Sequence, residues 1–393
     1  MAASDRLLPY SGRRVAVIGA SLGGLSAANV LHMLGFTVHV FERSTTTFEA
    51  RGHGLGYVDV DLWQRLRGVQ MRRQGQQASR AQGAFYYGDL WRFLYDGLPR
   101  GTVRLGRTIT GLGDDPVAHP TIDGQAYDLA VIADGGWSGL RRYLTAGKPF
   151  YSGYVVWRGS INPAYVPGFH SFGVFKAPPH LDTIVLPMST DDGRSSIMLG
   201  LFVATPEAEI VRPQTGAGRH TTDPEKKGEW ASSHADSVPE WFLPLYQQKF
   251  SHAAGGELVR LAKAIIAKGE IRPYPQFDFG TDAVTAGKIV MIGDAAHMAS
   301  PRTAVGAHTA ILDAMGLRKA FTAAAVVGGK VISEDAIDAA LARYSRDGTR
   351  RAQELHRRSV EIGKQFVPRR GAIMSPASLV SLTRNSGQQQ EDL

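Results

Sequence analysis

A glycine-rich turn near the start of the chain has the residue types that binding a dinucleotide phosphate requires. Gly19 and Gly24 bracket residues 19–24, where glycine permits a tight turn and close packing of a helix on a strand. Ser21 occupies the middle glycine position of this pattern, and its hydroxyl can itself bond a phosphate. Glu42 follows Gly19 by about 20 residues, the spacing of a carboxylate that accepts hydrogen bonds from a ribose. These residues predict a bound dinucleotide without a 2′-phosphate; the alternative is a glycine turn in an ordinary α/β protein.

Two later segments place an aspartate after a strand-like apolar run. Asp134 follows residues 127–133, and Asp294 follows residues 288–292. His297 comes shortly after Asp294, where a structural hydrogen bond is its expected role. No pair of histidines has the His-Glu-x-x-His spacing of a metal site, so we expect no metal.

The elements that must position these residues begin with a strand–helix–strand unit. We expect a strand over 14–20, a helix over 25–34 that ends at Gly35, and a strand over 36–41. Further strands are expected at these ranges: 103–112, 127–133, 151–161, 183–204 and 288–292. Glycine and proline punctuation in 151–161 and 183–204 predicts a mostly antiparallel second sheet. Helices are expected over 306–327 and 333–366, the latter with a break at Gly348.

The dinucleotide-binding lobe is therefore expected to be discontinuous in sequence. Residues 212–239 are polar and predict a long excursion from the second sheet. The expected boundaries are 11–70 for the first segment of the dinucleotide-binding domain, 71–86 for strands of the substrate domain, 87–150 for the second dinucleotide-binding segment, 151–275 for the substrate domain, 276–330 for the third dinucleotide-binding segment, 331–372 for a C-terminal helical region and 373–393 for a flexible tail.

Composition limits the classes of protein that the chain can be. The chain has 393 residues and no cysteine, which excludes disulfides, thiolate metal sites and a cysteinyl flavin link. The formal net charge is +8, but the arginine pairs are dispersed, so we expect no nucleic-acid partner and a surface that attracts anions. The first residues lack the apolar core of a signal peptide, and no long uninterrupted apolar run occurs. We expect a cytoplasmic protein with no membrane partner.

Together, the three motifs resemble those of the group A flavoprotein monooxygenases, the p-hydroxybenzoate hydroxylase class. Their order and spacing match over roughly residues 14–321. Within that class the chain is most similar to 2,6-dihydroxypyridine 3-hydroxylase-like enzymes, through these segments: 151–159, Thr222-Asp223, Ser237-Val238-Pro239 and 301–310. The resemblance implies an α/β fold with a Rossmann-type FAD-binding domain, a mostly antiparallel β-sheet substrate domain and C-terminal helices.

The resemblance also implies an activity. The cofactor would be FAD, NADH or NADPH would reduce it, and O2 would give a flavin C4a-hydroperoxide that hydroxylates an electron-rich aromatic or N-heteroaromatic small molecule. A Baeyer–Villiger or epoxidising monooxygenase remains an alternative, as does a redox-inactive flavin-binding regulatory protein. Gly159 stands where the halogenase signature has its second tryptophan, which argues against halogenation. Whether the chain forms a homodimer is left open.

Site residues follow from the resemblance position by position. It places Ser21, Leu22, Gly23 and Gly24, after Gly19, at the pyrophosphate; Glu42 and Arg43 at the ribose; Ile109 at the adenine side; Asp134 and Gly135 where both FAD and NAD(P)H are served; Asp294 at the ribityl chain; and Pro301, Ala304, Val305, Gly306 and Ala307 at the flavin's pyrimidine edge. Tyr87 stands near where many relatives have an arginine directed at the FAD phosphates, and Arg51 or Arg92 is expected to compensate.

Three residues are candidates for activating the substrate. His308 ends the third motif, beside the expected flavin edge, and an imidazole titrates near working pH. Tyr154 and Arg158 lie in the strand expected over 151–161. Any of the three could deprotonate a ring hydroxyl or bond to it, and a purely structural role for His308 is the alternative.

Overall fold

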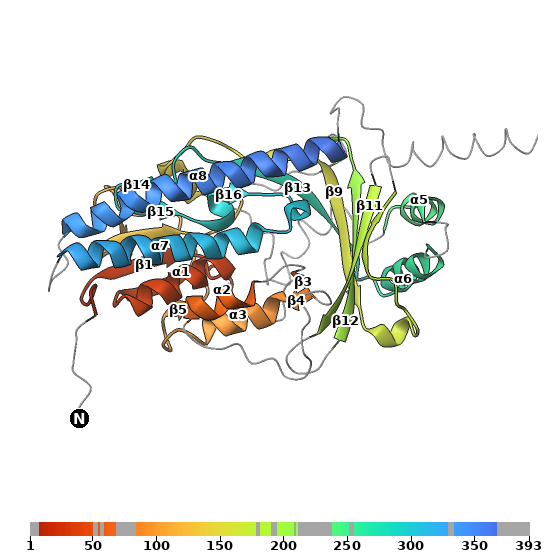
Figure 1. The fold of residues 1–393 in the computed structure, drawn as a ribbon, viewed down its shortest axis with the longest axis horizontal. Coiled ribbons are helices and arrows are strands. Elements are labelled where there is room, and N and C mark those ends of the chain that lie inside the picture. The colour runs from red at the N-terminus through yellow and green to blue at the C-terminus, as the bar shows by residue number, and fades with distance from the viewer. Residues whose placement is uncertain are drawn as a thin grey trace, which may run out of the picture.

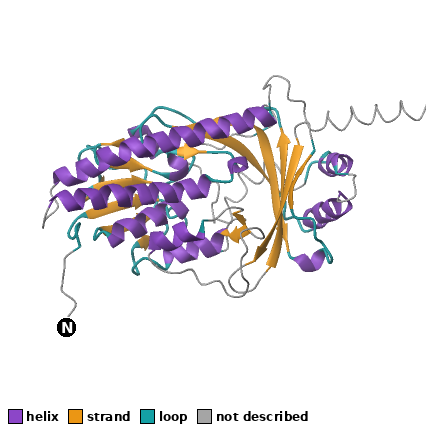
Figure 2. Cartoon of the chain, in the orientation of Figure 1, coloured by secondary structure: helices purple, strands orange, loops and turns teal. Residues whose placement is uncertain are grey.

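Two lobes make up the computed structural model, a helix-rich lobe and a lobe built on a second sheet (Figures 1 and 2). The structure describes residues 8–49, 54–55, 59–67, 84–177, 181–189, 195–207, 210, 238–250, 255–328 and 334–367. The predicted excursion over 212–239, except its last two residues, and the predicted tail over 373–393 lie outside these residues.

The first lobe contains a six-stranded sheet with the order β14-β15-β8-β1-β2-β5. Its strands are β1 (Arg14–Ile18), β2 (Thr37–Phe41), β5 (Val103–Arg104), β8 (Leu129–Ile132), β14 (Thr285–Ala286) and β15 (Ile289–Met291). All neighbours pair in parallel except β14 and β15. β8 is buried at every residue, as expected of a parallel strand covered on both faces.

Helices cover this sheet and extend across the molecule. They are α1 (Leu22–Met33), α2 (Val60–Arg67), α3 (Tyr87–Tyr95), α7 (Gly306–Gly328) and α8 (Glu334–Phe366). After α1, Gly35 adopts φ +101°, a left-handed conformation that suits glycine and stops the helix. Asn29 of α1 donates to the carbonyl oxygen of Leu94 at 2.8 Å, which joins α1 to α3. α8 lies along α7 and reaches the second sheet (Figure 1).

The second sheet is mostly antiparallel and has the order β16-β13-β9-β12-β11-β4-β3, with β10 paired to β11. Its strands are β3 (Gly54–Leu55), β4 (Ala84–Tyr86), β9 (Phe150–Ile161), β10 (Gly173–Lys176), β11 (Leu181–Ser189), β12 (Ser195–Ala204), β13 (Arg272–Gly280) and β16 (His297–Met298). The remaining elements are β6 (Thr121–Ile122), β7 (Gln125–Ala126), α5 (Phe242–Lys249), α6 (Gly255–Ala267) and the 3-10 turns η1 (Leu140–Tyr143), η2 (Pro163–Tyr165), η4 (Gly293–Ala295) and η5 (Pro301–Thr303).

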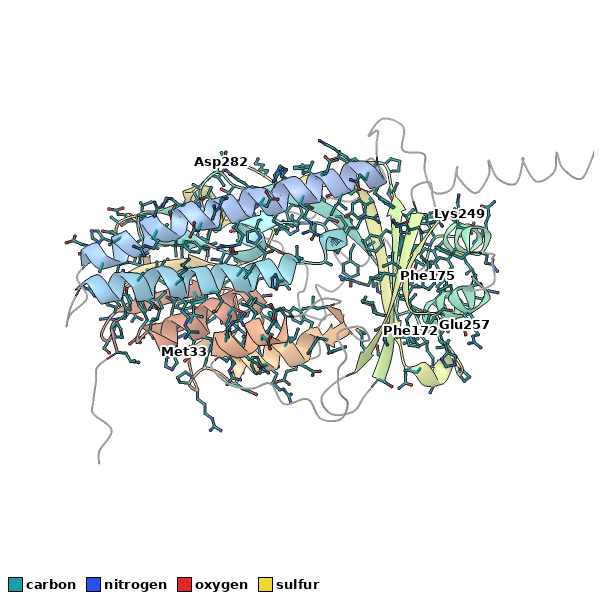
Figure 3. The ribbon with its side chains drawn as sticks, viewed as in Figure 1. Met33, Phe172, Phe175, Lys249, Glu257 and Asp282 are labelled. Carbon is teal, nitrogen blue, oxygen red and sulfur yellow. The ribbon has the colours of Figure 1, made fainter. Side chains whose placement is uncertain are left out.

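Side-chain alternation gives this sheet two distinct faces. Val155 and Trp157 pack with the helices α5 and α6, and the ring centroids of Trp157 and Phe242 lie 5.5 Å apart. Figure 3 shows Lys249 and Glu257 of these helices on the side away from the first lobe. Tyr154 and Val156, which alternate with these residues along β9, belong to a different cluster on the opposite face. We call this opposite face the inner face. The inner face is turned toward the first lobe (Figure 1).

Several element boundaries differ from those expected from the sequence. α8 is continuous through Gly348, so this glycine does not break the helix. A Cβ at this position would lie 2.9 Å from Val284 Cγ2, and glycine therefore permits the close packing of α8 at this point. The strand expected over 103–112 is limited to β5, and Gly106 follows it in a left-handed turn, φ +70°.

Two segments cross the expected domain boundaries as well. β3 lies within 11–70 yet pairs with β4 in the second sheet. β13 pairs with β9 on both sides of the expected boundary between residues 275 and 276. Sheet membership depends on pairing between distant segments, which local sequence does not encode.

Candidate active site

The three motifs meet at the carboxyl ends of β1, β8 and β15. A Cβ on Gly19 would lie 2.3 Å from Ala133 O, and a Cβ on Gly24 would lie 1.9 Å from Gly19 O. Both positions therefore require glycine, as the sequence indicates. A Cβ on Gly23 would lie 3.9 Å from Gly293 Cα, so the start of α1 faces the third motif. Ligands of open α/β sheets bind at this end of the strands.

Asp134 supplies a buried acceptor at this point. Burial raises the pKa of its carboxyl, opposed by a hydrogen bond from Ser138 and by the positive charges of Arg141 and Arg43. Its Oδ1 is shielded from solvent and has no hydrogen-bond partner among the described residues. Next to it, Gly135 has φ +91° and open space where a Cβ would be. A hydroxyl-bearing ligand fits this arrangement, because it would satisfy the orphaned oxygen.

Glu42 lies beside the glycine turn, at the end of β2. Its two carboxylate oxygens accept from the backbone N–H groups of Ala20 and Ser44, each at 2.8 Å. Each oxygen keeps a further lone pair, so the predicted contact with a ribose is compatible with these bonds. Arg43 is exposed and Ile109 is half-buried against the core of the first lobe.

Ser21 and Tyr87, the two residues that depart from the family pattern, contact each other. Ser21 Oγ and Tyr87 OH form a hydrogen bond of 2.8 Å. Ser21 is the N-cap residue of α1, yet its side chain caps no backbone N–H group. The guanidinium of Arg92 pairs with Glu49 at 2.7 Å, and Arg51 lies outside the described residues. At this turn the structure therefore presents two hydroxyls and the free N–H groups of a helix start.

Arg141 connects the second and third motifs, a role that the sequence prediction missed. Its guanidinium donates to three main-chain carbonyls: Gly136 O at 3.0 Å, Asp294 O at 3.2 Å and Ala295 O at 3.0 Å. It also stacks on the ring of Phe279, 3.7 Å from the centroid. Burial lowers the pKa of Arg141 to about 10, against the charges of Asp134 and Asp294. Its position at the end of the second motif is the only sequence signal for this role.

Asp313 of α7 fixes the turn that carries Asp294. Its carboxylate accepts from three donors: Gly293 N at 3.0 Å, His297 Nε2 at 2.6 Å and Arg351 Nε at 2.7 Å. Burial opposes the charge of Asp313, but His297 and Arg351 hold its pKa below the usual value. Burial alone would lower the pKa of His297, but the charge of Asp313 and its hydrogen bond raise it. The buried carboxylate of Asp313 thus lies between His297 and Arg351, while Asp294 itself is exposed.

The segment predicted to meet the flavin edge begins at η5 and ends at the start of α7. Ala304 has φ +56°, a left-handed conformation that costs a non-glycine residue about 1–2 kcal/mol. A Cβ on Gly306 would meet open space. The first N–H groups of α7, from Gly306 onward, have no intrahelical acceptor, so this segment can donate to a ligand. Pro301 and Ala304 are exposed, whereas Val305 and Ala307 are half-buried.

The three candidates for substrate activation lie in different surroundings. Tyr154 is fully buried, bonds to Ser300 Oγ and packs on Phe366, and burial raises the pKa of its phenol. Arg158 is partly buried on the inner face of the second sheet. His308 lies on the first turn of α7, and burial lowers its pKa against the opposing charge of Asp59. Tyr154 and Arg158 share a strand face, and no contact described by the structure joins His308 to either of them.

Comparisons with known proteins agree with this geometry. A family model described as an FAD binding domain matches residues 13–120 and 256–359, more than half of the chain, and the chain belongs to this family. The 3-amino-4-hydroxybenzoate 2-monooxygenase of Streptomyces platensis is 26% identical over 90% of this chain and 88% of its own length. The 6-hydroxynicotinate 3-monooxygenase of Bordetella bronchiseptica is 27% identical over 78% of this chain and 82% of its own. The structure of 2,6-dihydroxypyridine-3-hydroxylase from Arthrobacter nicotinovorans matches with a TM-score of 0.66 and 20% identity, covering 94% of this chain and 96% of that one.

The chain is therefore a flavoprotein with the p-hydroxybenzoate hydroxylase fold. It is an FAD-dependent monooxygenase of the aromatic hydroxylase class, with NADH or NADPH as co-substrate. Within the part of the chain that the structure describes, no helix is long and apolar enough to cross a membrane.

Proposed function

We propose that the chain hydroxylates an electron-rich benzenoid or pyridine ring that carries a hydroxyl or amino group. The observation that carries this proposal is the meeting of the three motifs near Asp134, whose Oδ1 has no hydrogen-bond partner among the described residues, next to β13 and β16 of the second sheet. The relatives act on 3-amino-4-hydroxybenzoate and on 6-hydroxynicotinate, rings of this electron-rich kind. A hydroxyl or amino group makes a ring carbon nucleophilic enough to take an activated oxygen.

The residues that would hold FAD are those around the meeting point of the motifs. The start of α1, residues 21–24, would receive the pyrophosphate, since the helix N-terminus and the Ser21–Tyr87 hydroxyls supply donors there. Glu42 and Arg43 would receive the adenosine ribose, and Ile109 would lie at the adenine side. Reduced by NADH or NADPH, bound FAD supplies the activated oxygen.

The flavin end of the cofactor would be held by the other two motifs. Asp134 and Asp294 would accept hydrogen bonds from cofactor hydroxyls. Pro301, Ala304, Val305, Gly306 and Ala307 would lie at the pyrimidine edge, where the N-terminus of α7 stabilises negative charge.

His308 is the residue we propose as the base that activates the ring. Its pKa is lowered by burial, so the imidazole is neutral at neutral pH and can accept a proton from a ring hydroxyl. Tyr154 suits this role less well, because its raised pKa keeps the phenol protonated. Tyr154 can still donate a hydrogen bond, and its contact with Ser300 connects β9 to the segment before η5.

A screen of ring substrates tests the proposal. Purified holoenzyme is mixed with NADH or NADPH and with hydroxylated or aminated benzoates and pyridines, and NAD(P)H consumption is compared with H2O2 release. A true substrate raises NAD(P)H consumption while H2O2 stays low, and the product gains one oxygen on the ring. Lactone or epoxide products would favour the Baeyer–Villiger or epoxidising alternative. NAD(P)H oxidation that no ring compound stimulates would favour a regulatory flavoprotein.

A further inference from the structure

Arg302 and Arg158 both lie at the inner face of the second sheet, and they differ in how their charge is compensated. Arg302, on η5, pairs with Asp182 of β11 at 2.6 Å and lies over the ring of Phe366. For Arg158 of β9, no carboxylate among the described residues lies within ion-pair distance. Within the described part of the chain, Arg302 therefore has a carboxylate partner and Arg158 does not.

Strand register fixes where Arg158 lies. It follows Tyr154 and Val156 on alternate positions of β9, so it shares the inner face with them. On one side it is paired with Gly200 of β12, which has no side chain to cover it. On the other side it is paired with Arg272 of β13. The register thus places Arg158 on the inner face. Figure 1 shows that β9 and its neighbours turn this face toward the flavin lobe.

The immediate neighbour of the guanidinium is an aromatic ring. Arg158 Cζ lies 4.4 Å from the ring centroid of Tyr274, and Nε is buried with no hydrogen-bond partner among the described residues. Burial lowers the pKa of Arg158, and among the described residues Tyr274 is the group that opposes this shift. Two other arginines with partly or fully buried guanidinium contacts have different partners: Arg351 pairs with Asp313, and Arg141 donates to backbone carbonyls. A ring and a phenol compensate a cation only in part.

The surface next to Arg158 is apolar on the same face. One step along the sheet, Leu186 and Met198 face each other in register, and they cluster with Met188 and Tyr86. A planar ring can pack on such side chains, because thioether and aliphatic groups adapt to its shape. A cation at the margin of an apolar surface matches a ring that carries one negative substituent.

We infer that Arg158 is the receptor for a carboxylate attached to the substrate ring, and that it selects ring acids over uncharged rings. This inference rests on the proposed ring hydroxylation. Arginine is suited to the role, because its planar fork donates two parallel hydrogen bonds to a carboxylate. Arg158 is a specificity-determining residue here and takes no part in moving the proton or the oxygen.

Binding to the FAD-loaded enzyme tests the inference without turnover. The probes are two matched pairs: 6-hydroxynicotinate with 2-hydroxypyridine, and 3-amino-4-hydroxybenzoate with 2-aminophenol. In each pair the second compound lacks only the carboxylate. Dissociation constants come from the change in flavin absorbance or fluorescence. We expect at least one acid to bind wild type about 10-fold or more tightly than its uncharged partner, the size of a charge-assisted hydrogen bond.

Three variants test whether Arg158 causes the preference for the ring acid over its uncharged partner. Arg158→Met should weaken binding of the preferred acid about 10- to 100-fold and leave the uncharged partner within about 3-fold. Arg158→Lys should retain part of the preference, since the charge remains but the fork is lost. Arg272→Met is the matched control: this arginine is paired with Arg158 in register but is exposed and donates to backbone carbonyls, so the acid should bind as in wild type. FAD content and the far-ultraviolet circular dichroism spectrum show that each variant is folded.

The outcomes separate the inference from the proposed function. If neither acid binds wild type more tightly than its partner, or if Arg158→Met keeps the full preference while folded with FAD, the inference is wrong. Hydroxylation of the uncharged rings alone would overturn it too, while supporting the proposed function. Conversely, tight Arg158-dependent binding of an acid that is never hydroxylated would support the receptor and contradict the proposed reaction.

Discussion

At the scale of single residues, Asp313 is the group on which the third motif depends most. It is buried between His297 and Arg351 and also accepts from Gly293 N. In Asp313→Asn, His297 and Arg351 would lose the carboxylate that they share, and breaking a buried ion pair costs about 3–5 kcal/mol. We expect a large drop in melting temperature and weaker FAD retention, measured by thermal denaturation and by titration of the apoprotein. Asp347→Asn, on the exposed surface of α8, is the control and should change neither. Wild-type stability and FAD affinity in Asp313→Asn would contradict the role assigned to Asp313.

His297 gives the same cluster a pH dependence. Its pKa is raised in the folded protein, so the imidazolium stabilises the fold fully below the unfolded value of about 6.5. This contribution is lost as pH rises through the raised folded pKa. The pKa of Asp313 is lowered, so its contribution is lost only as pH falls toward that lower pKa. We therefore expect the melting temperature to decline on raising the pH above about 6.5, and His297→Gln to flatten this decline. An unchanged slope in His297→Gln would assign it to other groups, and the charged neighbours to examine are Asp294, Arg141 and Arg351.

The variant His308→Gln distinguishes a catalytic role of this histidine from a structural one. If it accepts the proton of a ring hydroxyl, His308→Gln should keep FAD and NAD(P)H oxidation but divert oxygen to H2O2. The acidic limb of the pH dependence of kcat/KM should flatten as well. In wild type that limb should lie below about pH 6.5, because burial lowers the pKa of this histidine. Unchanged product yield per NAD(P)H and an unchanged pH profile would leave His308 with a packing role, and Tyr154→Phe would be examined next.

Residue types and spacing predicted the glycines of the first turn, because steric limits on a tight turn are local. They did not predict Arg141, Asp313 or Arg351. Arg141 reaches Ala295 across 154 positions, and Asp313 reaches Arg351 across 38. Such pairs are created by packing, and their members look like ordinary surface charges in the sequence.

At the scale of elements, the β1–turn–α1 unit sets the position of the phosphate site. Gly24→Ala would place a Cβ 1.9 Å from Gly19 O, so α1 would have to move away from β1. We expect this variant to lose bound FAD, measured by flavin absorbance per protein. Gly139→Ala is the control, because its Cβ would meet nothing within 4 Å and its φ is −79°. FAD retention at the wild-type level in Gly24→Ala would mean that the turn does not hold the cofactor.

Elements with strong local patterns were well predicted, and those whose form depends on a distant partner were not. The strands and helix of the first unit follow from apolar runs and from Gly35. Gly348, by contrast, was expected to break a helix, and only its neighbour Val284 on a distant segment shows why glycine occurs within α8. The strand expected over 103–112 was too long, since β5 lies at the edge of the sheet, where β2 is its partner among the described residues.

At the scale of the whole molecule, the chain passes between its two sheets more often than the sequence indicates. β3 and β16 are short strands of the second sheet that fall in segments expected for the flavin lobe, whereas β4 falls within 71–86, where strands of the substrate domain were expected. The inner face of the second sheet is thereby joined to the third motif, through contacts such as those of Tyr154 with Ser300 and of Arg302 with Asp182. The fold class and the existence of two lobes could be predicted, but these connections could not, because short strands carry too little pattern.

The most direct test of the central claim is oxygen-isotope labelling of the product. Holoenzyme, NAD(P)H and a ring compound identified by the screen are incubated under 18O2, and the product is analysed by mass spectrometry and NMR. We predict that one 18O atom enters the product and that it replaces a ring C–H with a ring C–OH, because the activated oxygen derives from O2. Oxygen incorporated from water, or a product in which the ring is unchanged and all 18O appears as H2O2, would contradict the assignment of an aromatic hydroxylase.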